Sequence, residues 1–219
     1  MRIDHRTHRQ GAWNNCWFRA ALDGLAFQRP EALTSMLQEG PARTFVVTFP
    51  GREPHAVTPD RADDAPYAAA LEAAAHAELG DARTPRMLSY GLGIGLLTGH
   101  NRAGYTNALG AGFAPLYITS KRRWLRRQLE NATAQRRLMV LGGSDGKWTT
   151  PKLNWVPPQH CFGLLEYEPS VGTARVRNPY GNNDGIPAER QRDGYGPGEF
   201  WVTLDELENS WCGLTIEDE

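Results

Sequence analysis

The sequence has few cysteines and no long hydrophobic run. Its three cysteines, Cys16, Cys161 and Cys212, are an odd number at wide spacing, which excludes a disulfide framework, and no two of them form a C-x-x-C pair for zinc. The chain lacks any stretch of the roughly 18 to 20 apolar residues that a membrane span needs, and its first residues lack the apolar segment of a secretory signal. We therefore expect no membrane contact, and the cysteines are either inert buried thiols or include one reactive thiol.

An excess of charge of one sign is also lacking, because 24 Lys and Arg residues face 25 Asp and Glu residues, for a net charge of -1. A near-neutral chain is not typical of a protein whose main task is to neutralise phosphates. A basic run over 121–137 is interpreted as the solvated face of a helix whose apolar stripe contains Trp124, Leu125 and Leu129. Nucleic acid is therefore not an expected partner.

Two small groups of polar residues are interpreted as solvent-exposed. His5 and His8 lie near the N-terminus outside any H-E-x-x-H pattern, so they are expected to be exposed tail residues rather than metal ligands. Asp60, Asp63 and Asp64 do not match the spacing of a calcium-binding loop. A solvated turn is the expected structure there, and no metal site is predicted.

Helical spacing of apolar residues dominates the first half of the chain. The segment 16–26 carries apolar side chains on two sides, which is typical of a buried helix, and Asn15 before it is a good N-cap. Pro66 suits the first position of an alanine-rich helix that Gly80 closes. Further expected elements are a helix that Pro30 opens and Gly40 stops, a helix over 121–131, and a short strand at 45–49.

The character of the sequence changes after residue 137. Short apolar or alternating runs, separated by Gly, Pro and Asn, predict an antiparallel sheet with strands at 138–141, 161–167, 173–177 and 200–203. Segregated helices and strands predict an α+β fold in a single domain over residues 1–219. Its helical lobe would span about residues 10–137 and its β lobe about residues 138–219, with a cleft between them.

Cys16 stands at the start of the first predicted helix, where backbone N–H groups lack partners and the helix dipole favours an anion. This position lowers the pKa of a thiol and favours the nucleophilic thiolate. A base is offered by His160, just before a predicted strand, and Asn178 ends the next strand, where its carbonyl oxygen can fix the imidazole. Cysteine first, with His and Asn roughly 130 to 150 residues later, is the order of papain-like proteases.

Local motifs point to a narrower family. The stretch Gln10-Gly11-x-x-x-x-Cys16-Trp17 resembles the Q-G-x-x-G-D-C-W motif of the calpain protease core. The segment 177–181 (RNPYG) is similar to that family's R-N-P-W-G, and 198–201 reads G-E-F-W, as in the motif that closes its domain. The helix over 67–80 and the Leu-Thr-Gly turn at 97–99 fall where calpains have similar features. The resemblance covers residues 10 to about 212 and implies a calpain-like cysteine protease with a papain-like two-lobe fold.

Several positions depart from the family's motifs. Its Gly-Asp before the cysteine is Asn14-Asn15 here, and its G-H-A-Y reads Q-H-C-F over 159–162. The tryptophan that shields the His–Asn bond is replaced by Tyr180, which can still cover that bond. Calpains take calcium in loops of the core, but the acidic positions cannot be matched residue by residue, so a calcium cofactor is left open and no metal ligand is assigned.

The resemblance implies a role for each matched residue. Cys16 is the nucleophile, His160 exchanges its proton with the leaving amine, and Asn178 orients His160. The side chain of Gln10 and the backbone N–H of Cys16 form the oxyanion hole. Trp17 beside the nucleophile is favoured as a packing residue, with substrate contact as the alternative. The further substrate-binding positions at the edge of the cleft are Gly91 and Gly143, because glycine lets an extended peptide approach closely.

The expected function is that of a thiol endopeptidase acting on a protein or peptide. Two alternatives stay open, namely acyl transfer or deamidation through the same thioester, and a non-catalytic module that binds a protein partner. A compact core of this kind is expected in bacteria, either in the cytoplasm or as part of a larger secreted effector or toxin, for which an inhibitor or immunity protein would be a further partner.

Overall fold

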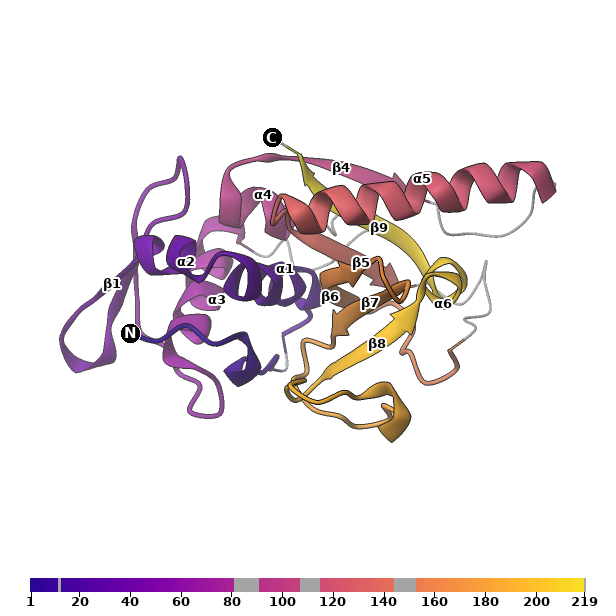
Figure 1. The fold of residues 1–219 in the computed structure, drawn as a ribbon. Helices are drawn as coiled ribbons and strands as arrows, with labels where there is room; N and C mark the ends of the chain where they lie inside the picture. The colour runs from indigo at the N-terminus through magenta and orange to yellow at the C-terminus, as the bar shows by residue number, and fades with distance from the viewer. Residues whose placement is uncertain (12, 81–90, 107–114, 144–152, 219) are drawn as a thin grey trace.

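The computed structural model describes residues 1–219 except for 12, 81–90, 107–114, 144–152 and 219. The described residues form an α+β fold, as predicted, with helices and two antiparallel sheets (Figure 1). The helices are α1 (Cys16–Gln28), α2 (Pro30–Met36), α3 (Pro66–Leu79), α4 (Leu92–Thr98), α5 (Pro115–Ala134) and α6 (Leu204–Ser210). The strands are β1 (Leu37–Glu39), β2 (Phe45–Val47), β3 (His55–Val57), β4 (Asn101–Thr106), β5 (Met139–Gly143), β6 (Cys161–Glu168), β7 (Thr173–Arg177), β8 (Glu199–Thr203) and β9 (Trp211–Asp218).

The larger sheet has the strand order β4-β9-β5-β6-β7-β8, and the smaller one the order β1-β2-β3. Successive residues of a strand point to opposite faces, and β5 shows this directly. Val140 belongs to a core that contains the side chains of α1, whereas Met139 and Leu141 belong to a second core that contains Leu125 and Leu129 of α5. The sheet is therefore buried on both faces, by α1 on one and by α5 on the other.

Helix α1 is the central helix of the fold. It lies between the helices α2, α3 and α4 on one side and the strands β5 and β6 on the other (Figure 1). Glycines permit the closest approaches, since a Cβ at Gly163 of β6 would lie 2.9 Å from the carbonyl oxygen of Ala20, and one at Gly93 of α4 would lie 2.8 Å from that of Trp17. The predicted buried helix is confirmed, and it extends to Gln28.

The structure corrects several predicted elements. The helix that starts at Pro30 ends at Met36 rather than near Gly40, and the chain continues as strand β1. Strands β3, β4 and β9 were not predicted. Because β4 pairs with β9, and α5 packs on the larger sheet, the change of character expected at residue 138 does not coincide with the boundary between the two cores.

The basic helix α5 carries ion pairs at its surface. Arg122 contacts Asp205 at 2.7 Å and Glu208 at 2.9 Å, and Arg126 contacts Glu130 at 2.9 Å. These contacts accord with a solvated helix face, and Leu125 and Leu129 are buried as predicted, but Trp124 of the predicted apolar stripe is exposed. Within the described part of the chain, no helix is both long enough and apolar enough to cross a membrane.

Candidate active site

The structure brings together the three residues predicted to form a catalytic triad. Cys16 is the first residue of α1, and its sulfur is hydrogen-bonded to the side chain of His160, which immediately precedes β6. Nε2 of His160 lies 2.9 Å from Oδ1 of Asn178, just after β7. A carbonyl oxygen only accepts, so Nε2 carries the hydrogen of this bond and Nδ1 is the ring nitrogen left for Cys16. All three side chains are buried.

The environment of Cys16 lowers its pKa to about 4. The largest cause is a hydrogen bond from the side chain of Cys161, and burial of Cys16 opposes it by raising the pKa. The hydrogen bond and charge of His160, together with the backbone of Cys161, lower the pKa further. At neutral pH the sulfur is therefore a thiolate, the form that attacks carbonyl carbon.

The start of α1 differs from the prediction in one respect. Asn15 occupies the N-cap position, but its side chain does not cap the helix and donates instead to the carboxylate of Glu72 on α3. The N–H groups of the first turn are therefore not taken by a side-chain cap. The backbone N–H of Cys16, predicted to contribute to an oxyanion hole, belongs to this turn.

Aromatic rings hold the imidazole of His160 in place. The ring of Tyr180 is stacked on it, with centroids 4.5 Å apart and an interplanar angle of 19°, and Phe162 contacts it edge-on at 4.9 Å. The backbone N–H of Tyr180 also donates to Oδ1 of Asn178 over 3.1 Å. Tyr180 is 44% exposed whereas His160 is only 4% exposed, so the tyrosine covers the histidine from solvent.

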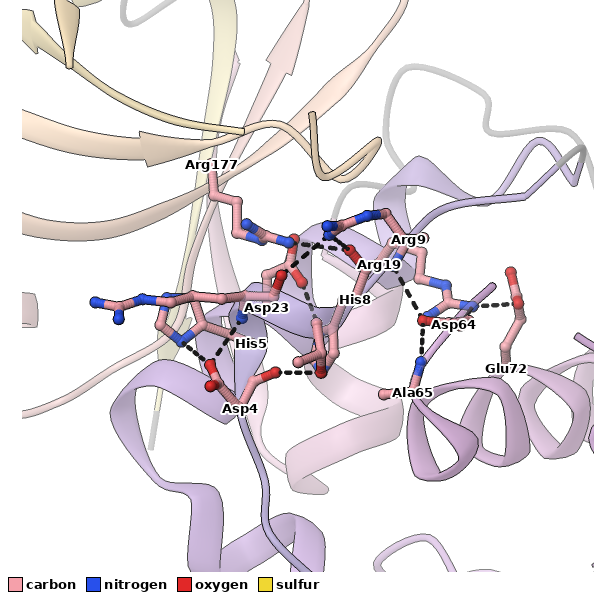
Figure 2. A network of polar contacts seen from close by, with 12 residues as sticks. Asp4, His5, His8, Arg9, Arg19, Asp23, Asp64, Ala65, Glu72 and Arg177 are labelled. Carbon is pink, nitrogen blue, oxygen red and sulfur yellow. Dashed lines mark hydrogen bonds and ion pairs between the residues drawn. The ribbon is translucent and has the colours of Figure 1, made fainter. Parts of the chain in front are cut away.

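A buried ion-pair network joins the helix of Cys16 to the strand that leads to Asn178 (Figure 2). Arg177 at the end of β7 places Nε 3.1 Å from a carboxylate oxygen of Asp23 on α1, and it donates to the carbonyl oxygen of His8 over 3.0 Å. The other oxygen of Asp23 lies 2.7 Å from Nδ1 of His8. This network therefore fixes α1 relative to β7.

His8 and His5 are buried, so the prediction that they are exposed tail residues is wrong. Nε2 of His8 contacts the hydroxyl of Tyr67. Burial lowers the pKa of His8, while Asp23 opposes this shift.

His5 lies 2.7 Å from Glu199 at the start of β8. Burial alone would raise the pKa of Glu199, but hydrogen bonds from His5, the backbone of Gly196 and Arg175 lower it to about 2.

The turn over 60–64 also differs from the prediction of a solvated turn. Asp64 is buried and pairs with Arg19 of α1 at 2.5 Å, while Arg19 also contacts Glu72 (Figure 2). The neighbouring Asp63 has a side chain that is 72% exposed. Among the described residues, no group of three or more His, Cys, Asp and Glu side chains is arranged to hold a metal ion.

Gln10 lies in the N-terminal segment that reaches the turn after β7. Its backbone N–H donates to the carbonyl of Pro179 over 2.9 Å, which brings Gln10 beside the residue that follows Asn178. Its side-chain nitrogen donates to the carbonyl of Trp13 over 3.2 Å, and its side-chain oxygen is buried without a hydrogen bond. The amide is thus engaged within its own loop, and its role at an oxyanion stays a prediction.

The three predicted substrate-binding residues differ in their surroundings. Gly143 is in contact with His160, since its N–H donates to the carbonyl of His160 over 2.7 Å and a Cβ there would lie 2.8 Å from the same oxygen. Trp17 is buried in the core, which agrees with the favoured packing role. Gly91 immediately precedes α4. Two residues later, Gly93 packs closely on α1, so helix packing accounts for part of this glycine-rich segment, and contact of Gly91 with substrate stays a prediction.

Two cavities border the site, and the sequence did not indicate either. One of about 190 Å³ is lined by Asn15 and Trp17, which flank Cys16, and by Trp13 and His76, whose rings lie 4.6 Å apart. The other, of about 290 Å³, is lined by residues around the histidine partner. They include Asn178, Tyr180, Asp184, Trp155 and Phe200. Trp13 and Asp184 are therefore additional candidates for substrate contact.

Comparison with known proteins adds no relative to this picture. No protein-family model matches the chain, and no curated protein matches it. Its functional assignment therefore depends on the geometry of the site and on the sequence motifs.

The low pKa of Cys16 predicts an unusual pH profile of alkylation. The rate of carboxamidomethylation of Cys16 by iodoacetamide should stay nearly flat as the pH falls from about 8 to about 5.5, and should decrease only as the pH passes through about 4. The alkylation rate of a thiol with an ordinary pKa decreases about tenfold for each pH unit over this range, because its thiolate fraction decreases. Over the same range the rate of a cysteine in the urea-unfolded chain should decrease by roughly two hundredfold as its thiolate fraction decreases, whereas the rate of Cys16 should change by less than about twofold.

Peptide mapping by mass spectrometry measures this rate for each cysteine, with the unfolded chain as the control. A rate for Cys16 that decreases tenfold per unit between about pH 8 and 6 would show that its pKa is not depressed.

Proposed function

We propose that this protein is a thiol endopeptidase with a calpain-like, papain-fold catalytic core. The observation that carries the proposal is the row Cys16–His160–Asn178, in which one buried imidazole is hydrogen-bonded to a thiolate on one side and to an amide oxygen on the other. This is the arrangement that a nucleophile, its proton-transfer partner and an orienting group require. In this reading the helices around α1 and the larger sheet are the two lobes.

The proposed reaction begins with attack of the Cys16 thiolate on the carbonyl carbon of a peptide bond. The negative charge that develops on the carbonyl oxygen is stabilised by the N–H of Cys16 and the amide of Gln10. Nδ1 of His160 gives its proton to the departing amine, and the C–N bond breaks to leave a thioester. His160 then takes a proton from water, the resulting hydroxide attacks the thioester, and the C–S bond breaks to release the acid.

Contacts among the matched motifs support the family assignment. The backbones of Arg177 in β7 and Glu199 in β8 lie opposite each other in the sheet, and a Cβ at Gly198 would lie 2.9 Å from the carbonyl oxygen of Asn178. The R-N-P-Y-G and G-E-F-W segments are therefore neighbours in the fold. Gln159, which stands where the family's motif has glycine, has a φ of 54°. Glycine adopts this left-handed conformation most readily, and for other residues it is less favourable by roughly 1 kcal/mol of conformational free energy.

The test is cleavage of labelled casein at neutral pH under reducing conditions, with and without added calcium. The native chain should release labelled peptides, and Cys16→Ala should abolish the release because no other side chain replaces the thiolate. Prior alkylation of Cys16 should have the same effect. If the alkylatable protein cleaves neither casein nor a diverse peptide pool, endopeptidase activity is contradicted.

Acyl transfer is distinguished in the same assay. The thioester is common to both reactions, so a glutamine-containing peptide and a labelled amine are supplied together. Incorporation of the amine without backbone cleavage would identify a transferase and overturn hydrolysis as the main activity.

A further inference from the structure

Cys161 contacts the candidate nucleophile, although no catalytic role was assigned to it. Its side chain and its backbone both form hydrogen bonds to the sulfur of Cys16. Both cysteines are 1% exposed and both are free thiols. In the G-H-A-Y motif of the family that this chain resembles, the corresponding residue is alanine, so this second thiol is a feature of the present chain.

The packing of α1 on β6 explains why the two thiols meet. Cys161 and Gly163 are two residues apart on β6, so they point to the same face of the sheet. Gly163 faces the carbonyl of Ala20, where α1 comes closest. Cys16 precedes Ala20 by one helical turn, about 6 Å along the axis, and Cys161 precedes Gly163 by about 6.6 Å along the strand. The two spacings match, which places the thiols opposite each other.

The fold holds this register firmly. Gly163 has no side chain to separate the helix from the strand, and Cys161 lies in the same buried core as the residues of α1. Cys161 is also paired with Gly142 of the neighbouring strand β5. Its backbone position is therefore set by β5 within the sheet and by α1 on the face of the sheet. Two thiols fixed in contact need little rearrangement to form a bond, whereas two mobile thiols lose conformational entropy when they are brought together.

We propose that Cys16 and Cys161 form a reversible disulfide when the protein meets a hydroperoxide, and that this bond is a modification site which switches the nucleophile off. Cys16 is the residue that reacts with the oxidant, and Cys161 is the residue that resolves the product. A thiolate next to a second thiol is the arrangement found in redox-sensing cysteines.

The chemistry takes two steps. The thiolate of Cys16 attacks one oxygen of the hydroperoxide, the O–O bond breaks, and a sulfenic acid forms while the released alkoxide or hydroxide takes a proton from solvent to become an alcohol or water. The sulfur of Cys161 then attacks the sulfur of Cys16, the S–O bond breaks, and hydroxide leaves as water with the proton of Cys161. Two thiols are oxidised by two electrons and one peroxide is reduced. An added dithiol reverses the oxidation.

The experiment treats the reduced protein with a slight excess of hydrogen peroxide and follows intact mass and non-reducing peptide maps. The native chain should lose two hydrogen atoms and yield one peptide pair that links Cys16 to Cys161. Iodoacetamide should no longer label Cys16, and dithiothreitol should restore full labelling. Cys212→Ala should behave like the native chain.

Two variants of the resolving residue test the assignment. Cys161→Ser keeps a hydrogen-bond donor beside Cys16, and Cys161→Ala introduces the residue of the family's motif. For this comparison the native chain and both variants receive a several-fold excess of peroxide, because a sulfinic acid consumes two peroxide molecules per thiol. In both variants Cys16 should then become a sulfinic acid, and dithiothreitol should leave at least ninety per cent of its labelling lost, roughly a tenfold contrast with the native chain.

Other outcomes would overturn the proposal. These are a link from Cys16 to Cys212, sulfinic acid at Cys16 of the native chain with Cys161 still free, or full recovery by dithiothreitol in both variants of Cys161. Mass and labelling are read without any peptide substrate. Failure of the disulfide is therefore distinguishable from failure of the proposed protease activity.

Discussion

Replacing His160 by alanine is expected to slow peptide hydrolysis by about 10⁴-fold, because the imidazole is the group that protonates the leaving amine and activates water in the proposed reaction. Alkylation of Cys16 at neutral pH should decrease far less. The hydrogen bond from the side chain of Cys161 is the largest single cause of the low pKa of Cys16, and it remains in the variant. Steady-state hydrolysis and iodoacetamide labelling of the same samples measure the two effects.

The matched control is His55→Ala. His55 is a half-buried histidine of β3 that contacts Glu78 at 2.8 Å and lines neither of the two cavities at the candidate site, so its loss should change turnover by less than a few-fold. Equal losses of labelling and hydrolysis in His160→Ala would indicate that His160 acts only by ionising Cys16, which would contradict its role in proton transfer to the amine.

Replacing Asp64 by alanine is expected to lower the free energy of unfolding by about 3 kcal/mol, whereas replacing its exposed neighbour Asp63 should lower it far less. Asp64 is a buried partner of Arg19 and accepts hydrogen bonds from the backbone N–H groups of Arg9 and Ala65. Its removal leaves buried donors without their acceptor. Asp63 pairs with Arg61 at the surface, where water replaces the contact.

Urea unfolding of the two variants at neutral pH measures both free energies, and an unchanged slope would show that only stability differs. The residues are adjacent in sequence and chemically identical, so the comparison isolates burial. Equal midpoints for the two variants would show that the ion pair of Asp64 with Arg19 contributes nothing to the stability of the fold.

Local pattern predicted the parts of the fold that depend on neighbours in sequence. The spacing of small and apolar residues gave α1 and α3, and alternation gave β6 and β7 close to their observed ends. Strands β4 and β9 were missed because a strand forms through its partner, and these two segments pair across more than a hundred residues of intervening chain.

The triad could be predicted because cysteine, histidine and asparagine occur in motifs with a recognisable order. The buried ion pairs that hold the surrounding elements in place could not be predicted in this way. His5 and Asp64 look like solvated residues in the sequence, since nothing near them marks a partner. Their burial depends on Glu199 and Arg19, which lie 194 and 45 residues away along the chain. Charged residues are buried only when such a partner exists, and pairing at that distance leaves no local trace.

The link between His5 and Glu199 has a consequence for biosynthesis. Domains fold as units while the ribosome delivers the chain from its N-terminus at roughly 5 to 20 residues per second. Cys16 emerges early, yet its imidazole partner, the asparagine that orients it and the carboxylate that anchors the N-terminal segment all belong to the last third of the chain. A polypeptide that has not yet been synthesised as far as Glu199 therefore contains Cys16 without its complete set of partners, so the proposed proteolysis cannot begin before that part of the chain has been made.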